Sequence, residues 1–126
     1  MSTQADFTTD EWRQLQYTPI WTFVAVAGVD CDIDHQEVHA LARELAEAHL
    51  YREPLVREVL TAAGEELAHL LPEARIDGES VLDGLERAAA ILDEKTEHDE
   101  AEHFKKAMLL IAKKVAEASG GFLGFG

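Results

Sequence analysis

The 126-residue chain has little positive charge. Its 11 Lys and Arg residues stand against 25 Asp and Glu residues, which gives a formal net charge of -14. Nucleic-acid binding relies on clustered Lys and Arg side chains that neutralise phosphates, so this balance argues against a nucleic-acid partner and, for the same reason, against an anionic membrane surface. Before Lys105 the chain has only one lysine, Lys95, which is also compatible with adaptation to high salt.

Cysteine and long apolar runs are scarce as well. The single cysteine, Cys31, cannot form a disulfide within the chain. The longest apolar run near the end, AMLLIA, is far shorter than the roughly 20 residues that span a bilayer. The first residues, MSTQADFTTDEW, lack the basic segment and the apolar run of a secretory signal. We therefore expect a cytoplasmic protein with no transmembrane segment.

Proline and glycine are few, and they stand between segments whose apolar residues recur at helical spacing. A chain of this length with 47% hydrophobic residues can bury one core. We expect an all-α fold, a compact single-domain bundle of about six helices over residues 8–121. Residues 1–7 are expected to be a flexible tail. Residues 122–126, an apolar Gly/Phe tail, are expected to dock back onto the domain or a partner, or to be a shortened final helix-turn segment.

Capping signals predict two separate helices near the N-terminal end. Thr8 and Glu11 form a capping box for a short first helix. Thr18 and Pro19 then have the character of an N-cap and a first-turn proline, and they open a second helix whose residues are nearly all apolar.

Four further helices are expected after residue 34. The first runs from about His35 to His49, and the next begins at Pro54, bends at Gly64 and ends at Pro72. The predicted caps of the last two helices are Ser80 with Asp83, and Thr96. The buried stripes of these helices are predicted to include Ala42, Leu82 and Ala89. The predicted core contains Trp21, Phe23, Val24, Leu41, Leu60, Leu67, Leu85, Met108, Ile111 and Val115.

The stretch GVDCDIDHQEVH, residues 28–39, concentrates potential metal ligands. Thiolate, imidazole and carboxylate groups together can hold zinc or a similar ion, and carboxylates can hold calcium. We therefore identify a candidate site for a divalent metal, zinc or calcium. Its residues are Asp30, Cys31, Asp32, Asp34, His35 and His39.

Two specific motifs are excluded for this stretch, and a structural role competes with metal binding. An EF-hand loop that starts at Asp30 needs a glycine at its sixth position and a glutamate at its twelfth, and the chain has neither. The two histidines have the spacing of a zinc protease, but Gln36 stands where the catalytic base belongs. Asp34 followed by Glu37 is a capping box, so the stretch is first of all a turn that leads into a helix.

A second candidate metal set lies on two predicted helices. Glu66-x-x-His69 and Glu100-x-x-His103 have the i, i+3 spacing of carboxylate-bridged di-iron bundles. In a chain with 25 acidic residues the same pairs arise readily on solvated helix surfaces. The two further glutamates that such a site needs would come from among Glu44, Glu47, Glu58 and Glu86.

The last predicted helix has an acidic first half and a basic second half. This order complements the helix dipole, so its lysines are interpreted as a solvated helix end, with a partner surface as the alternative. These lysines are Lys105, Lys106, Lys113 and Lys114.

The segments FTTDEW, TPIWTFVAVAGVDCDIDHQE and MLLIAKKVAEASGGFLGFG resemble the TerB-like family of tellurite-resistance and stress-associated bacterial proteins. In that family a hydrophobic helix ends in Ala-Asp-Gly, and after a short turn a glutamate opens the next helix, near both ends of the domain. Residues 24–27 and 115–118 look like the two copies, with Gly28-Val29 and Ser119-Gly120 in place of the Asp-Gly pair. The resemblance implies a non-catalytic helical module linked to chemical stress, divalent cations and membrane-associated complexes.

We therefore expect an acidic, TerB-like interaction module that has a protein partner and responds to a divalent metal. The alternative is a ferritin-like di-metal carboxylate bundle that binds iron and acts on oxygen or peroxide. The sequence leaves the oligomeric state open.

Overall fold

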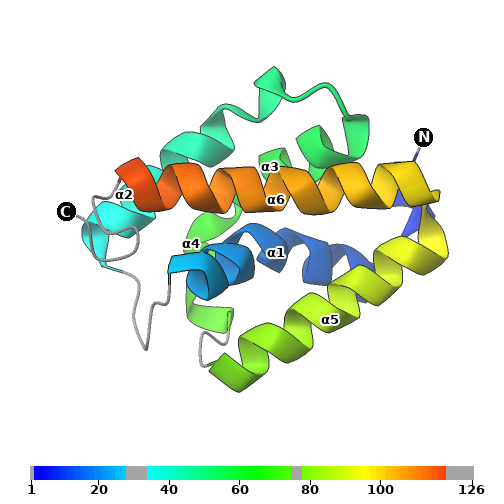
Figure 1. Ribbon diagram of the computed structural model, residues 1–126, viewed down its shortest axis with the longest axis horizontal. Helices are drawn as coiled ribbons and strands as arrows, with labels where there is room; N and C mark the ends of the chain where they lie inside the picture. Colours follow the sequence, from blue (N-terminus) through cyan, green and yellow to red (C-terminus); the bar gives the residue numbers. More distant parts are fainter. Residues whose placement is uncertain (1, 28–33, 75–77, 119–126) are drawn as a thin grey trace.

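A computed structural model describes residues 2–27, 34–74 and 78–118 (Figure 1). Over these ranges the chain forms six α-helices and no strand, which confirms the all-α prediction. The helices are α1 (Thr9–Ala27), α2 (His35–Ala46), α3 (Pro54–Glu65), α4 (Leu67–Glu73), α5 (Gly78–Lys95) and α6 (His98–Ala118). The short 3-10 helices η1 (Gln4–Asp6) and η2 (Ala48–Leu50) precede α1 and follow α2.

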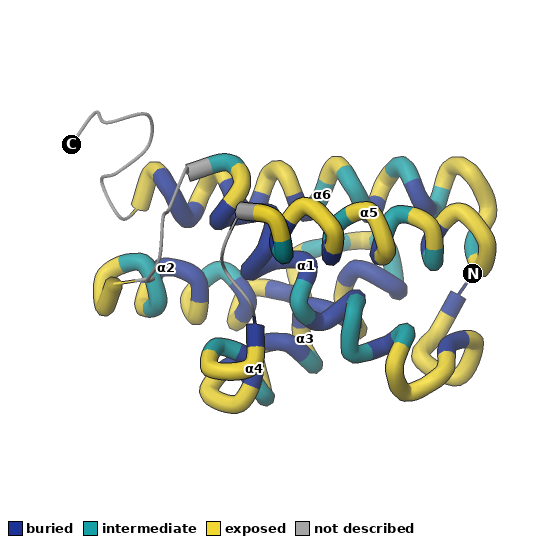
Figure 2. Tube along the Cα trace, turned by 90° about the horizontal axis from the view of Figure 1, so that it is seen from below, coloured by how far each residue is buried: buried dark blue, intermediate teal, exposed yellow. Residues whose placement is uncertain are grey.

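Helix α1 is the central element of the bundle, and it packs against α6, α5 and α3. Helices α5 and α6 form an antiparallel hairpin that is closed at residues 96–97 and widens away from that turn (Figure 1). Both helices contact α1 more extensively than they contact each other. Helices α2 and α3 pack on one another and complete the bundle against α6 and α1. Figure 2 shows that each long helix alternates buried and exposed positions, as amphipathic helices around one core do.

The two helices expected near the N-terminal end are one continuous helix, α1. Its start is as predicted, because Glu11 N–H donates to Thr8 Oγ1 at 3.1 Å and Thr8 N–H donates to Glu11 Oε1 at 2.8 Å. The predicted second start at Thr18 is wrong. Pro19 lacks the N–H that would bond the Leu15 carbonyl, but the Thr18 hydroxyl donates to that carbonyl at 2.6 Å, so the helix continues through the proline.

The middle helices are shorter than predicted. Helix α2 ends at Ala46 rather than His49, and the following residues form η2. The helix predicted to run from Pro54 to Pro72 is divided at Glu66, whose φ of -109° and ψ of 13° separate α3 from α4. Pro72 lies inside α4 and does not end it.

The last two helices begin at other residues than predicted. Helix α5 starts two residues before Ser80, which is therefore inside the helix. Helix α6 starts two residues after Thr96, and the Glu97 carbonyl accepts the bond from its first turn. Thr96 instead donates its hydroxyl to the Leu92 carbonyl at 2.6 Å. The Thr96 hydroxyl therefore bonds a backbone carbonyl at the end of α5 and does not cap the beginning of α6.

All the predicted core residues are buried except Leu85, which is partly buried. The predicted buried stripes of the helices were less accurate than the predicted core. Ala42 and Leu82 are exposed, and Ala89 is only partly buried. On α5 the residues that face α1 are shifted around the helix, so that Ala88 is buried in place of its neighbour. Leu82 consequently points away from the core.

Residues 2–7, expected to be part of a flexible tail, contact the rest of the bundle in the structure. Ser2 donates from its backbone N–H and from Oγ to the Glu100 carboxylate, at 2.9 Å and 2.8 Å. Phe7 is buried and its ring lies 5.9 Å from that of Trp12. The apolar anchor at Phe7 and the polar anchor at Ser2 hold this segment on the bundle. The expected docking of residues 122–126 lies outside the described residues.

Candidate functional site

An apolar groove lies in the opening between α5 and α6, with α1 as its floor. Its volume is about 240 Å³, and two threonines and one lysine are the polar residues among those that line it. The lining includes Thr18, Leu85, Ala89, Phe104, Met108 and Leu109.

A close contact between α5 and α1 leaves this space open. At Gly84 the α5 backbone lies directly against the Trp21 ring, where a Cβ atom would approach ring carbons to 2.6–2.8 Å. Because α5 packs closely against α1 at Gly84, it diverges from α6. The groove is the consequence of that divergence.

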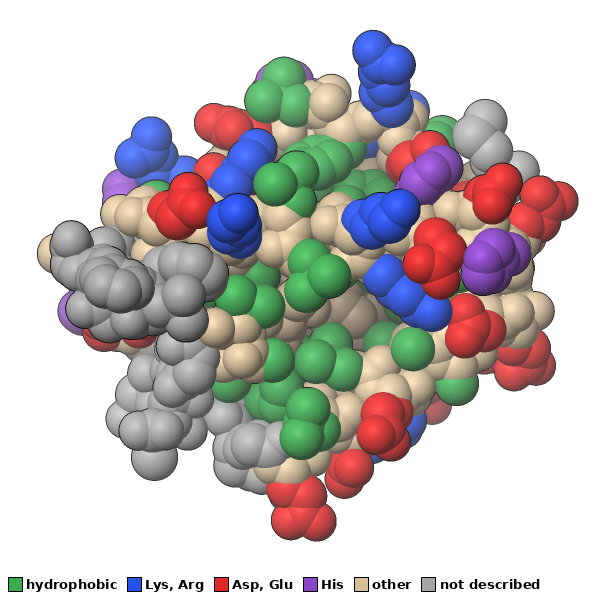
Figure 3. All heavy atoms as spheres, viewed as in Figure 1, with side chains coloured by type: hydrophobic (Ala, Val, Ile, Leu, Met, Phe, Trp, Pro, Cys, Tyr) green, Lys and Arg blue, Asp and Glu red, His purple; other side chains and the backbone are tan. Residues whose placement is uncertain are grey.

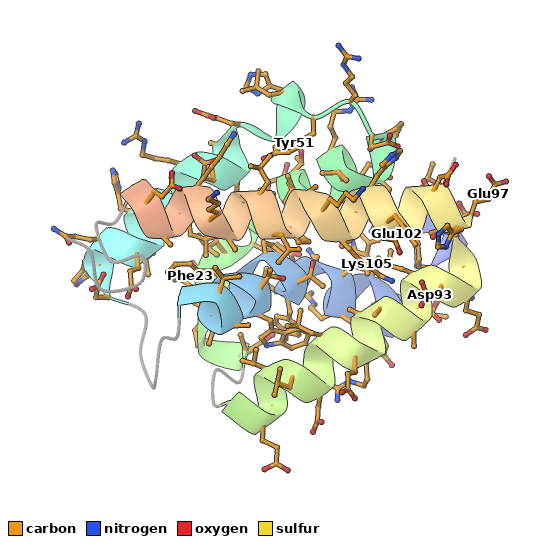
Figure 4. The ribbon with its side chains drawn as sticks, viewed as in Figure 1. Phe23, Tyr51, Asp93, Glu97, Glu102 and Lys105 are labelled. Carbon is orange, nitrogen blue, oxygen red and sulfur yellow. The ribbon has the colours of Figure 1, made fainter. Side chains whose placement is uncertain are left out.

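An ion pair crosses the narrow end of the groove. Lys105 Nζ on α6 lies 3.1 Å from Asp93 Oδ1 on α5, and the two side chains point toward one another in Figure 4. Lys95, at the end of α5, lies 3.5 Å from Glu11 on α1. Exposed and partly exposed pairs of this kind contribute little stability, because water and salt screen them. Their geometry nevertheless ties the closed end of the hairpin together.

Two large apolar side chains stand exposed on the helices that form the walls of the groove; Leu109 is among the lining residues, and Leu82 lies one turn before the lining residue Leu85. Leu82 of α5 is 59% exposed and Leu109 of α6 is 55% exposed. Leu110, 45% exposed, adds apolar surface farther around α6. Figure 3 shows hydrophobic side chains gathered over the region between the two helices. Exposed apolar side chains beside an apolar groove on a small domain are characteristic of a docking surface.

The two walls carry opposite charge around these leucines. On α6, exposed Lys106 and Lys113 stand three residues before and four residues after Leu109. On α5, two exposed glutamates stand at the same offsets from Leu82; they are Glu79 and Glu86. Residues at these offsets share one face of a helix. Figure 3 shows Lys and Arg side chains over α6 and Asp and Glu side chains along α5, so the two helices present different charges beside the groove.

The candidate metal stretch is described only from Asp34 onward. Asp34 Oδ1 accepts from Glu37 N–H at 2.8 Å, and Glu37 Oε1 accepts from Asp34 N–H at 2.9 Å, which confirms the predicted capping box. His35 and His39 are exposed in α2, on one face of the helix by their spacing. The other three candidate ligands lie outside the described residues; they are Asp30, Cys31 and Asp32. Zinc or calcium binding here stays a prediction.

The residues of the second candidate metal set have separate partners. Glu66 accepts hydrogen bonds from Arg13 and Gln16 of α1. Glu100 accepts from Ser2, as described above, and His103 Nδ1 lies 3.1 Å from Glu53 Oε1. Only the backbone of His69 is engaged by a member of the set, through its N–H to the Glu66 carbonyl.

No group of three or more His, Cys, Asp or Glu side chains suited to hold a metal ion occurs within residues 2–27, 34–74 and 78–118. The described part of the chain therefore offers no observation that favours the di-iron alternative. Glu66 joins the start of α4 to α1, and Glu100 joins the N-terminal segment to α6; iron binding by this set stays a prediction.

A groove between α5 and α6 is not among the expectations from the sequence, although one signal is present. Leu109 and Leu110 are adjacent in a helix, so the two side chains lie about 100° apart and cannot share one narrow buried stripe. Lysines stand one turn away on both sides. The lysines are interpreted above as a solvated helix end, and the structure adds that Lys105 and Leu109 line an apolar groove.

The chain is similar to the uncharacterized protein ORF11' of Methanothermobacter thermautotrophicus. The two are 32% identical over 125 residues, which cover 96% of this chain and 82% of the relative. No family profile matches the sequence, and no solved structure matches it. Among the described helices, none combines the length and the apolar character that crossing a membrane requires.

Proposed function

We propose that this chain, which belongs to the same family as ORF11' of Methanothermobacter thermautotrophicus, is a non-catalytic helical module. The module binds a protein partner through the α5–α6 groove. The observation that carries this proposal is the apolar groove between α5 and α6, with Leu109 exposed in its lining and Leu82 exposed one turn before the lining residue Leu85. Covering each of these half-exposed leucines would contribute about 1 kcal/mol to binding.

The chemistry of the groove favours binding over catalysis. The Thr18 hydroxyl donates to the Leu15 carbonyl, and Lys105 is paired with Asp93. Two of the three polar residues of the lining therefore already have structural partners. What the groove offers a partner is apolar surface with charged edges, which is the composition of a protein–protein interface.

Three further features belong to the proposal and rest on the sequence. The module is of the TerB-like type and acts in the cytoplasm in response to chemical stress. The ligand-rich residues 30–39 provide its response to a divalent metal. The resemblance of the three quoted segments supports the first two features, and the choice of ligand types supports the third.

Site-specific photo-crosslinking in the cells that naturally contain the protein tests the proposed binding face. A benzophenone amino acid replaces Leu109 in one variant and Leu50 in the other. Leu50 is the matched control because it is also a large exposed apolar residue, at 65%, but lies in η2, which packs on α3 and α2. We expect a discrete crosslinked protein from position 109 and none from position 50. Mass spectrometry of the crosslinked peptide identifies the partner.

Failure of the proposed function has a clear signature. If position 109 gives no crosslink, or the same products as position 50, the groove is not a binding face. Circular dichroism of both variants is needed to establish that each retains the helical fold.

A further inference from the structure

We propose that the partner bound in the α5–α6 groove is a second copy of this chain, paired as a symmetric dimer. This inference rests on the proposed function and names the occupant of the same face. The two-fold axis would lie in the interface and run along the groove, between α5 and α6. Helix α6 of each copy would then lie against α5 of the other.

The face formed by α5 and α6 is complementary to itself. A symmetric dimer joins the same patch on both subunits, so the patch must carry both halves of every contact. The exposed face of the two helices does so, because α6 has exposed Lys106, Leu109 and Lys113 at the same offsets as exposed Glu79, Leu82 and Glu86 on α5. A two-fold axis along the groove brings basic wall against acidic wall and leucine against leucine.

The order of the lysines along α6 and of the glutamates along α5 agrees with the directions of the two helices. Helices α5 and α6 are antiparallel, so Lys106 and Glu86 are the members of each wall nearer the closed end of the hairpin. At a rise of about 1.5 Å per residue, they lie about 12 Å and about 14 Å from that end. Lys113 and Glu79 lie about 22 Å and about 24 Å from it by the same measure. Each lysine therefore meets a glutamate of the partner at its own level.

The leucines follow the same register. Leu109 lies about 17 Å and Leu82 about 20 Å from the closed end. Leu109 of each copy would therefore pack against Leu82 of the other. Both are among the most exposed large apolar side chains of the described residues. An apolar centre with charged edges is the arrangement of a specific interface, in which the centre supplies affinity and the edges supply register.

The chain's own C-terminal segment is a less suitable occupant. Residues 119–126, SGGFLGFG, carry no charged side chain and would leave both charged walls without partners. An unrelated protein would need an acidic edge and a basic edge at matching spacing, whereas a second copy has this pattern by construction. The charges therefore favour a second copy.

The test is sedimentation velocity of the full chain over a series of concentrations, with charge-reversal variants. We expect a reversible dimer. Lys106→Glu and Glu86→Lys each place two like-charged pairs in the symmetric interface, and each should weaken dimerisation about tenfold or more. The double variant Lys106→Glu, Glu86→Lys restores opposite charges and should regain the original affinity to within about threefold.

Lys114→Glu is the matched control. Lys114 is an exposed lysine next to Lys113, but it lies about 100° around α6 and away from the groove. This variant changes the net charge as Lys106→Glu does, and it should leave the dimer unchanged. Circular dichroism of every variant checks that the helices are retained.

Each other outcome overturns the dimer. A chain that stays monomeric at every concentration has no such interface, and a dimer that the reversals do not weaken, or that the double variant does not restore, uses another face or register. A monomer that dimerises only after removal of residues 119–126 would identify that segment as the occupant. A crosslink from position 109 to a different protein, with a monomeric chain, would leave the proposed function intact and refute only the second copy.

Discussion

Gly84 of α5 packs directly against the indole ring of Trp21 of α1, and there is no room for a side chain between them. A Cβ atom at Gly84 would lie 2.6 Å from Cζ3 of the ring. Trp21 is itself buried and stacks against Tyr17, with the ring centroids 4.9 Å apart, so the indole cannot simply move aside. This contact sets the distance between α5 and α1 and thereby keeps the groove open toward α6.

Gly84→Ala should therefore destabilise the protein even though alanine is the better helix former. The propensity gain of about 1 kcal/mol is outweighed by overpacking, and we expect a net loss of about 1–2 kcal/mol in the free energy of unfolding. Urea denaturation measures it. In a Trp21→Leu background the same substitution should cost less or become stabilising, since a smaller side chain faces it. An equal cost in both backgrounds would show that the indole is not the cause.

Thr18→Val should destabilise by about 1–3 kcal/mol, because it leaves the Leu15 carbonyl without a donor in the interior. The Thr18 side chain is buried, and its hydroxyl lies 2.6 Å from that carbonyl. A Pro19→Ala background is the matched control, since alanine restores the backbone N–H that proline lacks. Thr18→Val should cost clearly less there. Thermal unfolding of the four proteins in this cycle gives the coupling between the two positions.

Asp34→Ala should lower the stability by about 0.5–2 kcal/mol in the presence of a chelator, because the cap on α2 needs no metal. The 2.8 Å bond from Glu37 N–H to Asp34 Oδ1 is lost in this variant, whereas Asp34→Ser retains a cap oxygen and should be close to wild type. Chemical denaturation with and without zinc measures both variants. A loss of stability that appears only with zinc would assign Asp34 to coordination instead.

Calorimetric titration with zinc and calcium tests the candidate site of residues 30–39. If the site is real, the intact chain binds one of these ions more tightly than about 10 μM, or about -7 kcal/mol, and the variant His35→Ala, His39→Ala loses this binding. Equally weak binding by both proteins would indicate that the acidic surface alone attracts the cations.

The pKa of the Tyr51 phenol should exceed its usual value of 10.0, because burial disfavours the phenolate and Glu44 and Glu47 add like charge. The Tyr51 hydroxyl is buried and has no hydrogen-bond partner among the described residues. The unfolded chain loses this proton first as the pH rises. The stability contributed by the neutral phenol is therefore present below pH 10 and is lost as the pH rises through the raised pKa.

Ultraviolet titration of a Tyr17→Phe variant isolates Tyr51, since the chain has two tyrosines. We expect ionisation above pH 10, and we expect Tyr51→Phe to reduce the loss of stability in that range. An ordinary pKa for Tyr51 in the folded variant would contradict this account.

The core and the helical class could be predicted from the sequence because they depend on local information. Leu41, Leu60 and Ile111 recur at helical spacing within their own segments, and all three are fully buried. The caps at Thr8 and Asp34 were also predicted, since each uses a side chain and a backbone group three residues apart.

The misassigned boundaries depended on distant or competing contacts. A helix start is expected at Thr18 because proline is common in the first turn of a helix. In the fold this segment of α1 packs against α5 and α6, and it remains helical because the buried Thr18 hydroxyl donates to the Leu15 carbonyl. The orientation of Leu82 could not be obtained from spacing alone. Small shifts in which face of α5 meets α1 decide whether this side chain is buried, and Gly84 against Trp21 sets that face.

The sequence by itself determined that the chain is acidic and helical, with one apolar core and a cap at each of two helix starts, because charge, periodicity and capping are properties of residues close together in the chain. Only the tertiary structure decided that Leu109 and Leu82 are exposed on the two helices that form the walls of the groove, with lysines beside the first and glutamates beside the second. Those walls come from helices that meet α1 more closely than they meet each other, and the packing of side chains distant in sequence determines that geometry.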